Sequence, residues 1–152
     1  MKSFDVFVAP RCCKFEGKAK KIGYACLIAF MCNRYSLYQI ITLGLWVVPA
    51  IDHDQIIFFF DKTSTPLGYV SWAYLAPDSE ARLLHDTDFL LHASEWNEGG
   101  NAWIIDFCFP KGGVKEAVIW LKNFFRKEGV DKVHWVRRNK DYAVKQTFIY
   151  RF

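Results

Sequence analysis

The sequence predicts an α/β domain built on a single mixed β-sheet flanked by helices. Short segments rich in aromatic and β-branched residues are typical of strands, and they are interspersed with segments whose apolar residues recur at helical spacing. In the second half, a strand is followed by an amphipathic helix and then by two further strands. This order favours one sheet over a helical bundle or a sandwich. With 152 residues and 52% hydrophobic residues, the chain is expected to form one domain, residues 1–152.

The first half is expected to contain three strands and two helical segments. A short strand over Phe4–Val8 comes first, and the helical segments follow, separated near Asn33-Arg34. Two aromatic and β-branched strands come next, joined by a hairpin turn. The expected ranges are Ile22–Cys32 and Ser36–Leu43 for the helices, Gln55–Phe60 and Leu67–Leu75 for the strands, and Asp61–Pro66 for the turn.

The second half begins with a helix at Pro77, with Asp78 as the expected N-cap and with apolar positions at Leu83, Leu84, Leu90 and Leu91. The remaining elements are a loop over Trp96–Asn101, a strand over Ala102–Phe109, a helix over Val114–Lys127 ended by Gly129, and strands over Val130–Arg137 and Ala143–Phe152. The last residues, Phe148–Phe152, are suited to an edge strand at which two copies could form a homodimer.

Several functional classes are not favoured. No apolar stretch reaches transmembrane length, and the N-terminus lacks the features of a secretory signal, so a cytoplasmic protein is expected. The cysteines form no CxxC pair and the histidines lack metal-ligand spacing, so no metal site is expected. The chain is basic near both ends and acidic over residues 52–106. This pattern indicates either a polyanionic partner or a merely solvated surface, and the acidic centre argues against a nucleic acid.

Asp106 is the most informative single residue, because it interrupts the apolar run Trp103–Phe109. A carboxylate there is expected to be at least partly buried, which is costly unless it is paired or hydrogen-bonded. Two interpretations follow: an ion pair or backbone brace, or a catalytic or substrate-orienting group. Cys108 should point to the same side of the strand, but the sequence nominates no base to activate it.

The turn Pro110-Lys111-Gly112-Gly113 lies between this strand and the next helix. Backbone N–H groups at a helix N-terminus favour an anion, glycine permits close approach, and Lys111 adds a positive charge. A phosphate is therefore a sensible ligand, although the turn matches neither a Walker A loop nor a Rossmann fingerprint. The alternative is a plain strand–helix turn.

From Ile22 to Lys127 the chain resembles the toxin-activating lysine acyltransferases, which fatty-acylate RTX protoxins such as hemolysin. The resemblance implies a fold related to the GCN5-type N-acetyltransferases and transfer of a fatty acyl group from acyl carrier protein to a lysine ε-amine. The landmarks that carry it occur in order: Pro49-Ala50-Ile51, Gln55, Pro66, Ser71-Trp72-Ala73, Glu80, Trp96, Gly99, Trp103, Ile105-Asp106 and Pro110.

The resemblance also implies a catalytic pair, a histidine near the N-terminus and an aspartate in the strand. Asp106 matches the aspartate, whereas Tyr35 stands at the histidine position and the family's Ser-x-x-His reads Cys32-Asn33-Arg34-Tyr35. Tyr35 could act as a general acid toward the departing thiolate, or a lysine that arrives deprotonated could attack without a base. A third interpretation is a non-catalytic module that binds acyl groups or acyl carrier protein.

The remaining expectations concern donor and acceptor. No cofactor is expected to stay bound; the donor is fatty acyl-carrier protein, through its phosphopantetheine thioester, or acyl-CoA. Lys111, Gly112 and Gly113 would hold the phosphate of the pantetheine arm, and Trp72 and Trp103 would wall the acyl channel. Carrier proteins are acidic, so basic residues are expected to steer docking: Lys115, Lys122, Arg126, Arg137 and Arg138. The acceptor is a protoxin or a small ribosomal peptide with a lysine or ornithine.

Overall fold

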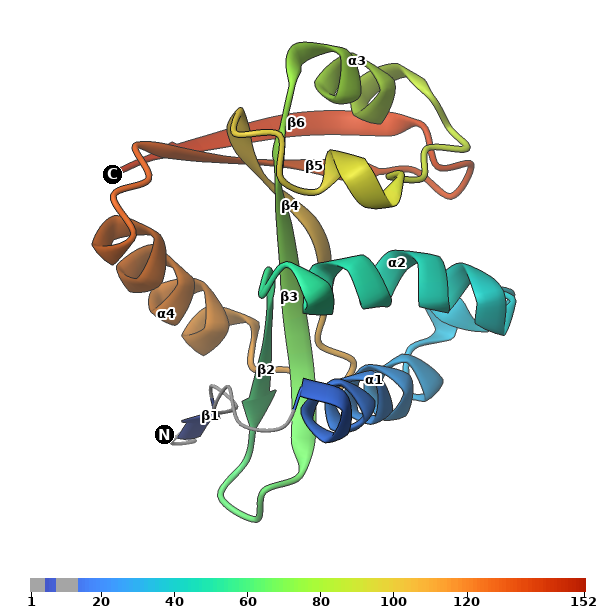
Figure 1. Cartoon of the computed structure of the whole chain (residues 1–152), viewed down its shortest axis with the longest axis vertical. Helices are drawn as coiled ribbons and strands as arrows, with labels where there is room; N and C mark the ends of the chain where they lie inside the picture. Colours follow the sequence, from blue (N-terminus) through green and yellow to red (C-terminus); the bar gives the residue numbers. More distant parts are fainter. Residues whose placement is uncertain (1–4, 8–13) are drawn as a thin grey trace.

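The computed structural model describes residues 5–7 and 14–152, and these build one six-stranded sheet. The strands lie in the sheet in the order in which they occur in the sequence. Neighbouring strands are antiparallel except β4 and β5, which run parallel, so the expected single mixed sheet is confirmed (Figure 1). The strands are β1 (Asp5–Phe7), β2 (Ile56–Phe60), β3 (Pro66–Leu75), β4 (Asn101–Cys108), β5 (Lys132–Arg138) and β6 (Val144–Arg151).

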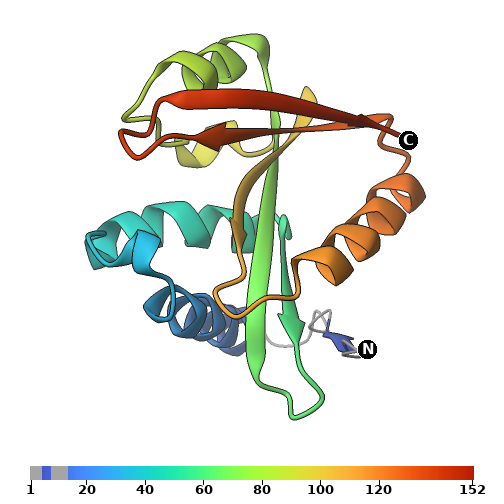
Figure 2. The ribbon, with the colours of Figure 1, turned by 180° about the vertical axis from the view of Figure 1, so that it is seen from behind.

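Helices cover both faces of the sheet. Helices α1 and α2 pack on one face and α4 packs on the other, as the front and back views show (Figures 1 and 2). Helix α3 lies close to the end of β3 that leads into it. The helices are α1 (Lys14–Phe30), α2 (Ile40–Asp52), α3 (Pro77–His85) and α4 (Val114–Lys127), with 3₁₀ turns at Asn33–Tyr35 and Ala93–Glu95. None of the helices within residues 14–152 has the length and apolarity needed to cross a membrane.

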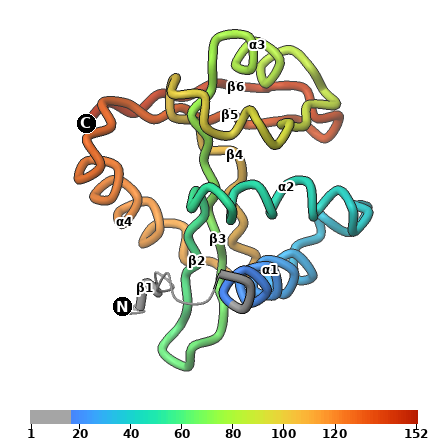
Figure 3. Tube along the Cα trace, viewed as in Figure 1, coloured from blue at the N-terminus to red at the C-terminus, as the bar shows by residue number. Residues whose placement is uncertain are grey.

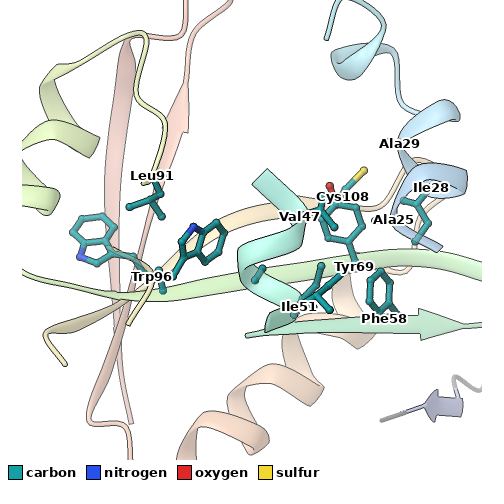
Figure 4. Packing of buried hydrophobic residues seen from close by; sticks show 14 of the residues in the cluster. Ala25, Ile28, Ala29, Val47, Ile51, Phe58, Tyr69, Leu91, Trp96 and Cys108 are labelled. Atoms are coloured by element: carbon teal, nitrogen blue, oxygen red, sulfur yellow. The ribbon is translucent and has the colours of Figure 1, made fainter. Parts of the chain in front are cut away.

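The sheet separates two hydrophobic cores, which explains the continuous apolar run of β2. All five residues of β2 are buried, because successive side chains alternate between the faces. Phe58 packs toward α1 and α2, among residues that include Ile28 and Val47 (Figure 4). Phe59 points the other way, toward α4, into the core that contains Leu121 and Phe125.

The prediction for residues 36–43 is wrong in its position. The segment Asn33–Tyr35 forms a 3₁₀ turn, and α2 begins at Ile40 and continues to Asp52, through Pro49. Pro49 lies in the last turn of the helix, where its ring removes one i→i−4 hydrogen bond, and the neighbouring Ala50 and Ile51 are buried against the sheet. Burial in the core therefore outweighs the local signal against a helix.

The N-cap prediction for α3 is also wrong. Ala76 occupies the cap position and Pro77 begins the helix, so Asp78 lies inside the first turn. There its carboxylate faces the positive end of the helix dipole, which explains why the residue still favours a helix start. The helix ends at His85. Leu91 is buried, but it belongs to the segment after the helix and not to the helix itself.

Other expected elements are confirmed. Helix α4 has the predicted bounds, Val114–Lys127, and the left-handed Gly129 (φ 71°) follows its C-terminus. The hairpin between β2 and β3 is closed by Asp61, whose side chain accepts hydrogen bonds from the backbone N–H groups of Thr63 and Thr65. Phe4 and Val8, the ends of the expected first strand, lie outside the described residues.

The parallel strands β4 and β5 separate soon after they meet. Only two residue pairs join them, Ala102 with Val133 and Trp103 with His134. Beyond these pairs the β5–β6 ribbon crosses the direction of β3 and β4, which the Cα trace shows clearly (Figure 3). Beyond the two pairs, the backbone N–H and C=O groups of β4 and β5 no longer pair with each other, and an opening is left between the two strands.

Candidate active site

Two cavities lie at the point where β4 and β5 separate, one on each face of the sheet. The α2-side cavity, of about 700 Å³, is lined by Tyr38 and Trp46 among others, and the α4-side cavity, of about 490 Å³, is lined by Val118 and Leu121 among others. Five residues line both cavities: Arg34, Ile104, Ile105, Val136 and Arg137. The two cavities therefore meet at the opening between the strands.

Asp106 lies beside this meeting point with its carboxylate enclosed by hydrogen-bond donors. The residue is 2% exposed. Its Oδ1 accepts hydrogen bonds from Tyr35 Oη (2.5 Å), Arg34 Nη2 (2.8 Å) and the backbone N–H of Phe107 (2.9 Å). Its Oδ2 accepts hydrogen bonds from the hydroxyls of Tyr69, at 2.7 Å, and Tyr35. The expected burial is confirmed, and these donors offset the cost of desolvating the charge.

A β-bulge directs Asp106 to this side of the sheet. Ser71 pairs with Asp106, but the next residue, Trp72, pairs with Ile104, so Ile105 is an extra residue in β4. As a result Ile105 and Asp106 both face the α1–α2 side, where Ile105 packs against the core. Cys108 lies on the same side, as the spacing predicts.

The 3₁₀ turn before α2 brings Tyr35 to Asp106 across 71 positions of the chain. Its ring is 7% exposed and packs edge-on against Tyr38, with ring centroids 5.2 Å apart. Burial, followed by the negative charge of Asp106, raises the pKa of the Tyr35 hydroxyl well above its ordinary value. The same two causes raise the pKa of Tyr69. Both hydroxyls therefore stay protonated at neutral pH and act as hydrogen-bond donors to Asp106.

These raised pKa values predict a loss of stability at alkaline pH. In the unfolded chain Tyr35 and Tyr69 ionise near their ordinary pKa of about 10, whereas in the folded chain they keep their protons. Above about pH 10 the unfolded state therefore binds fewer protons, and the free energy of unfolding falls by up to about 1.4 kcal/mol per pH unit for each group. Urea unfolding at neutral and alkaline pH measures this slope. The double variant Tyr35→Phe/Tyr69→Phe should begin less stable but decline less steeply, and an equal slope would contradict the assignment.

Arg34 and Tyr69 belong to the cluster although sequence reasoning gave neither of them a role. Burial lowers the pKa of the Arg34 guanidinium, but the neighbouring Tyr35 and Asp106 outweigh this and raise it, so the group stays charged. The only sequence signal for Arg34 was its place beside Tyr35. Tyr69 gave no signal, because its contact depends on the register of β3 against β4.

The glycine turn lies at the rim of the α4-side cavity. Gly112 (φ 94°) and Gly113 (φ 101°) have left-handed backbones that side chains rarely adopt, and Gly113 caps α4. The next residue, Val114, lines the cavity, and Lys111 is exposed. The structure thus brings the expected phosphate-binding segment to the edge of a cavity.

Trp72 and Trp103 lie elsewhere. Trp72 is buried against Phe124 and Phe125 of α4. Trp103 donates from Nε1 to Glu80 (2.7 Å) and stacks on His134. Neither is among the described residues that line the two cavities, so their part in an acyl channel stays a prediction.

Cys108 is not positioned as a nucleophile. Its side chain is buried, and burial, followed by the charge of Asp106, raises the pKa of its thiol. A thiol with a raised pKa holds little of the reactive thiolate at neutral pH. Among the described residues, no group of three or more histidine, cysteine or acidic side chains could hold a metal ion.

The five basic residues expected to steer a carrier protein fall into two groups. Lys122 and Arg137 line the α4-side cavity, and Arg137 and Arg138 line the α2-side cavity. Lys115 and Arg126 are exposed on α4. Arg138 also has a structural role, because its guanidinium donates hydrogen bonds to the carbonyls of Leu83 (2.6 Å) and Tyr142 (2.7 Å).

Comparison with known proteins bears on both fold and site. A model of the RTX toxin acyltransferase family (HlyC) matches residues 15–148. The chain is 44% identical over 66 residues to the RTX-II toxin-activating lysine-acyltransferase ApxIIC of Actinobacillus pleuropneumoniae. The aligned segment is 43% of this chain and 40% of ApxIIC. It is 35% identical over 66 residues to the protein-lysine myristoyltransferase HlyC of Escherichia coli. This aligned segment is 43% of this chain and 38% of that protein. The chain thus matches about two fifths of the length of these relatives.

Among solved structures, the loading GNATL domain of CurA from Lyngbya majuscula superposes with a TM-score of 0.60. The superposition covers 92% of this chain and 67% of that one, at 10% sequence identity. At this identity the likeness concerns the fold alone, and it confirms the expected N-acetyltransferase-like architecture.

Proposed function

Because this chain belongs to the RTX toxin acyltransferase family, we propose that it is a fatty acyltransferase acting on the side-chain amine of a lysine or ornithine. One observation carries the proposal: two cavities on opposite faces of the sheet meet beside a cluster in which Asp106 and Tyr35 are buried and Arg34 is partly exposed. A transfer between two substrates needs both reactants at one point in a fixed orientation, and this arrangement supplies such a point.

The acyl donor would enter from the α4-side cavity. Apolar residues such as Val118 and Leu121 suit an acyl-pantetheine arm, and the left-handed Gly112–Gly113 segment with Lys111 suits its phosphate. The donor is then acyl carrier protein or acyl-CoA. An acidic carrier would be attracted by the basic residues of α4 and β5, which are Lys115, Lys122 and Arg126 on α4, Arg137 at both cavities and Arg138 at the α2-side cavity.

The acceptor would enter from the α2-side cavity, so that its amine reaches the thioester at the opening between the strands. The lone pair of the amine attacks the carbonyl carbon, the C–N bond forms, and the C–S bond then breaks. Asp106 would orient the groups around the reacting atoms, because its two oxygens fix Arg34, Tyr35 and Tyr69. The acceptor can be a protoxin or a small peptide.

Tyr35 would supply a proton to the departing thiolate. Its raised pKa keeps it protonated and excludes it as the initial base, and it also weakens it as an acid, so Tyr35 would give its proton to the thiolate only as it takes up the proton that leaves the attacking nitrogen. The attacking nitrogen gives one proton to the Tyr35 oxygen and Tyr35 gives one proton to the thiolate, so the products are an amide and a free thiol and Tyr35 is regenerated.

Replacing Tyr35 by phenylalanine is expected to lower kcat about ten- to a hundredfold, because the proton donor is lost while the ring stays in place. Release of the carrier thiol in the presence of acceptor measures this rate. A thiol whose pKa is below that of pantetheine is a better leaving group and needs less protonation. With a donor thioester of such a thiol, kcat should therefore fall much less in the variant. An equal loss with both donors would contradict the general-acid role.

The burial of Asp106 and Tyr35 also favours a second candidate, a non-catalytic acyl- or carrier-binding module. The Tyr35 hydroxyl donates a hydrogen bond to Asp106, and both residues are buried from solvent. Mass analysis of acyl-loaded carrier protein distinguishes the two candidates. Loss of the acyl group only when the acceptor is present supports the transferase, whereas tight binding of a carrier that keeps its acyl group supports the module.

A further inference from the structure

Arg34 occupies the junction of the two cavities and remains partly open to both. Its side chain is 59% exposed, whereas the side chain of its partner Asp106 is fully buried. Arg34 is one of the five residues that line both cavities, and it is the one that also contacts the Asp106 carboxylate. The guanidinium therefore connects the buried cluster with the space in which two substrates would meet.

The contacts of Arg34 use only part of its hydrogen-bonding capacity. Nη2 donates to Asp106 Oδ1 (2.8 Å) and to Tyr35 Oη (3.0 Å), and the guanidinium carbon lies 5.2 Å from the centre of the Tyr35 ring. Within residues 5–7 and 14–152, all hydrogen bonds of this side chain run through Nη2. A guanidinium has five N–H donors, so Nη1 and Nε keep donors for a ligand while Nη2 holds the group in place.

The surroundings favour negative charge in a ligand at this point. The described residues that line the two cavities include Arg34, Arg137, Lys122 and Lys140, and they include no aspartate or glutamate. Asp106 lies behind Arg34 and is already neutralised by it. A group that becomes negative during the reaction would be stabilised here, because donors that are already held in place stabilise charge as it develops.

From these observations we infer that Arg34 binds the thioester carbonyl oxygen and stabilises the negative charge that this oxygen gains when the amine attacks. This inference rests on the proposed acyl transfer. As the C–N bond forms, the carbonyl π electrons move onto oxygen, and the oxyanion accepts hydrogen bonds from the free N–H groups of Arg34. When the C–S bond breaks, these electrons re-form the carbonyl and the thiolate leaves. No co-reactant is needed.

The inference gives Arg34 a catalytic role that a purely structural ion pair would not have. If Arg34 only held Asp106 and Tyr35 in position, a lysine at residue 34 could keep the ion pair and most of the rate. A carbonyl-binding role depends on donors beyond the one nitrogen that contacts Asp106, and a lysine ammonium does not reproduce the planar fork of a guanidinium.

The kinetic test compares Arg34→Gln and Arg34→Lys with the wild-type protein, using acyl carrier protein as donor and a lysine-bearing peptide as acceptor. We expect kcat to fall about a hundred- to a thousandfold in Arg34→Gln with a much smaller rise in KM for the carrier, and to recover only slightly in Arg34→Lys. Free guanidinium ion should restore part of the rate of Arg34→Gln. Lys62→Gln, which removes an exposed charge in the β2–β3 turn, is the control and should keep the wild-type rate.

Full recovery in Arg34→Lys, or no response to guanidinium in a folded Arg34→Gln protein, would overturn the inference. A binding test does not depend on turnover. Carrier protein bearing an acyl thioester should bind the wild type more tightly than carrier bearing the matching alkyl thioether, which lacks the carbonyl. Arg34→Gln should lose this preference. If the wild type transfers no acyl group but shows the preference, the proposed function fails and the carbonyl-binding role of Arg34 stands; equal binding of both carriers to the wild type overturns that role.

Discussion

Replacing Asp106 by asparagine is expected to lower the rate of acyl transfer about a thousandfold, the largest functional effect predicted for this chain. The substitution keeps the shape of the side chain but removes its charge. Arg34 loses its ion-pair partner, and two tyrosine hydroxyls and an arginine then compete for the single acceptor oxygen of an amide. Because buried donors are left poorly satisfied, the free energy of unfolding should also fall, by about 1–3 kcal/mol.

The measurement combines single-turnover kinetics with urea unfolding of the same protein. Asp131→Asn is the matched control, because Asp131 is exposed and its carboxylate has no part in the cluster. The kinetic loss should greatly exceed the fraction of unfolded protein, which at the expected stability loss stays small. An Asp106→Asn protein that is folded and transfers acyl groups at the wild-type rate would show that the cluster is only a structural brace.

Replacing Gly100 by alanine is expected to give the largest loss of stability, about 3 kcal/mol or more. A Cβ atom at this position would lie 1.8 Å from the backbone carbonyl oxygen of Leu75 and 2.6 Å from its carbonyl carbon. These are backbone atoms at the end of β3, so they cannot move aside as a flexible side chain would. Gly100 immediately precedes β4, and the close approach fixes the start of the strand that carries Asp106.

Thermal unfolding measures this effect, and a loss of about 3 kcal/mol corresponds to a fall in Tm of about 6–12 °C in a domain of this size. Gly44→Ala is the control. Gly44 lies inside α2, and a Cβ there would meet nothing within 4 Å, so alanine should stabilise the helix by about 0.5–1 kcal/mol. A Gly100→Ala protein as stable as the wild type would mean that the loop before β4 can shift away from Leu75.

The sequence predicts elements best where local pattern and tertiary packing agree. Helix α4 follows an amphipathic stripe whose members Leu121 and Phe125 are buried, and its predicted bounds are confirmed. Helix α2 lacks such a stripe: Ile40 is 83% exposed, although Val47 is buried. Because α2 is apolar on its exposed side as well as on its buried side, its sequence shows no alternation of apolar and polar residues at helical spacing. The bounds of this helix were therefore predicted wrongly.

The same distinction holds for the site. Asp106 was identifiable because one carboxylate interrupts an apolar strand, and Tyr35 was identifiable from the resemblance to a known family. Tyr69 reaches Asp106 across 37 positions and Arg34 reaches it across 72. Contacts of this kind depend on the register of β3 against β4, on the bulge at Ile105 and on the turn before α2. No local pattern encodes such combinations.

The apolar surface around the α1–α2 corner is a further feature that the sequence did not reveal. Leu37 is 91% exposed and Phe30 is 77% exposed, and both lie near the turn that carries Arg34 and Tyr35. A surface of this kind in a folded domain usually contacts a partner. Leu37 directly precedes Tyr38, which lines the α2-side cavity, so a contact at Leu37 would bear on access to the site.

The most direct test of the account is the intact mass of a lysine-bearing acceptor after incubation with the wild-type protein and fatty acyl-carrier protein. We predict a gain equal to one acyl group on the side-chain amine, with stoichiometric release of the carrier thiol and no gain when that amine is blocked by dimethylation. An acceptor of unchanged mass, with the carrier bound to the protein and still acylated, would contradict the account and establish a binding module instead.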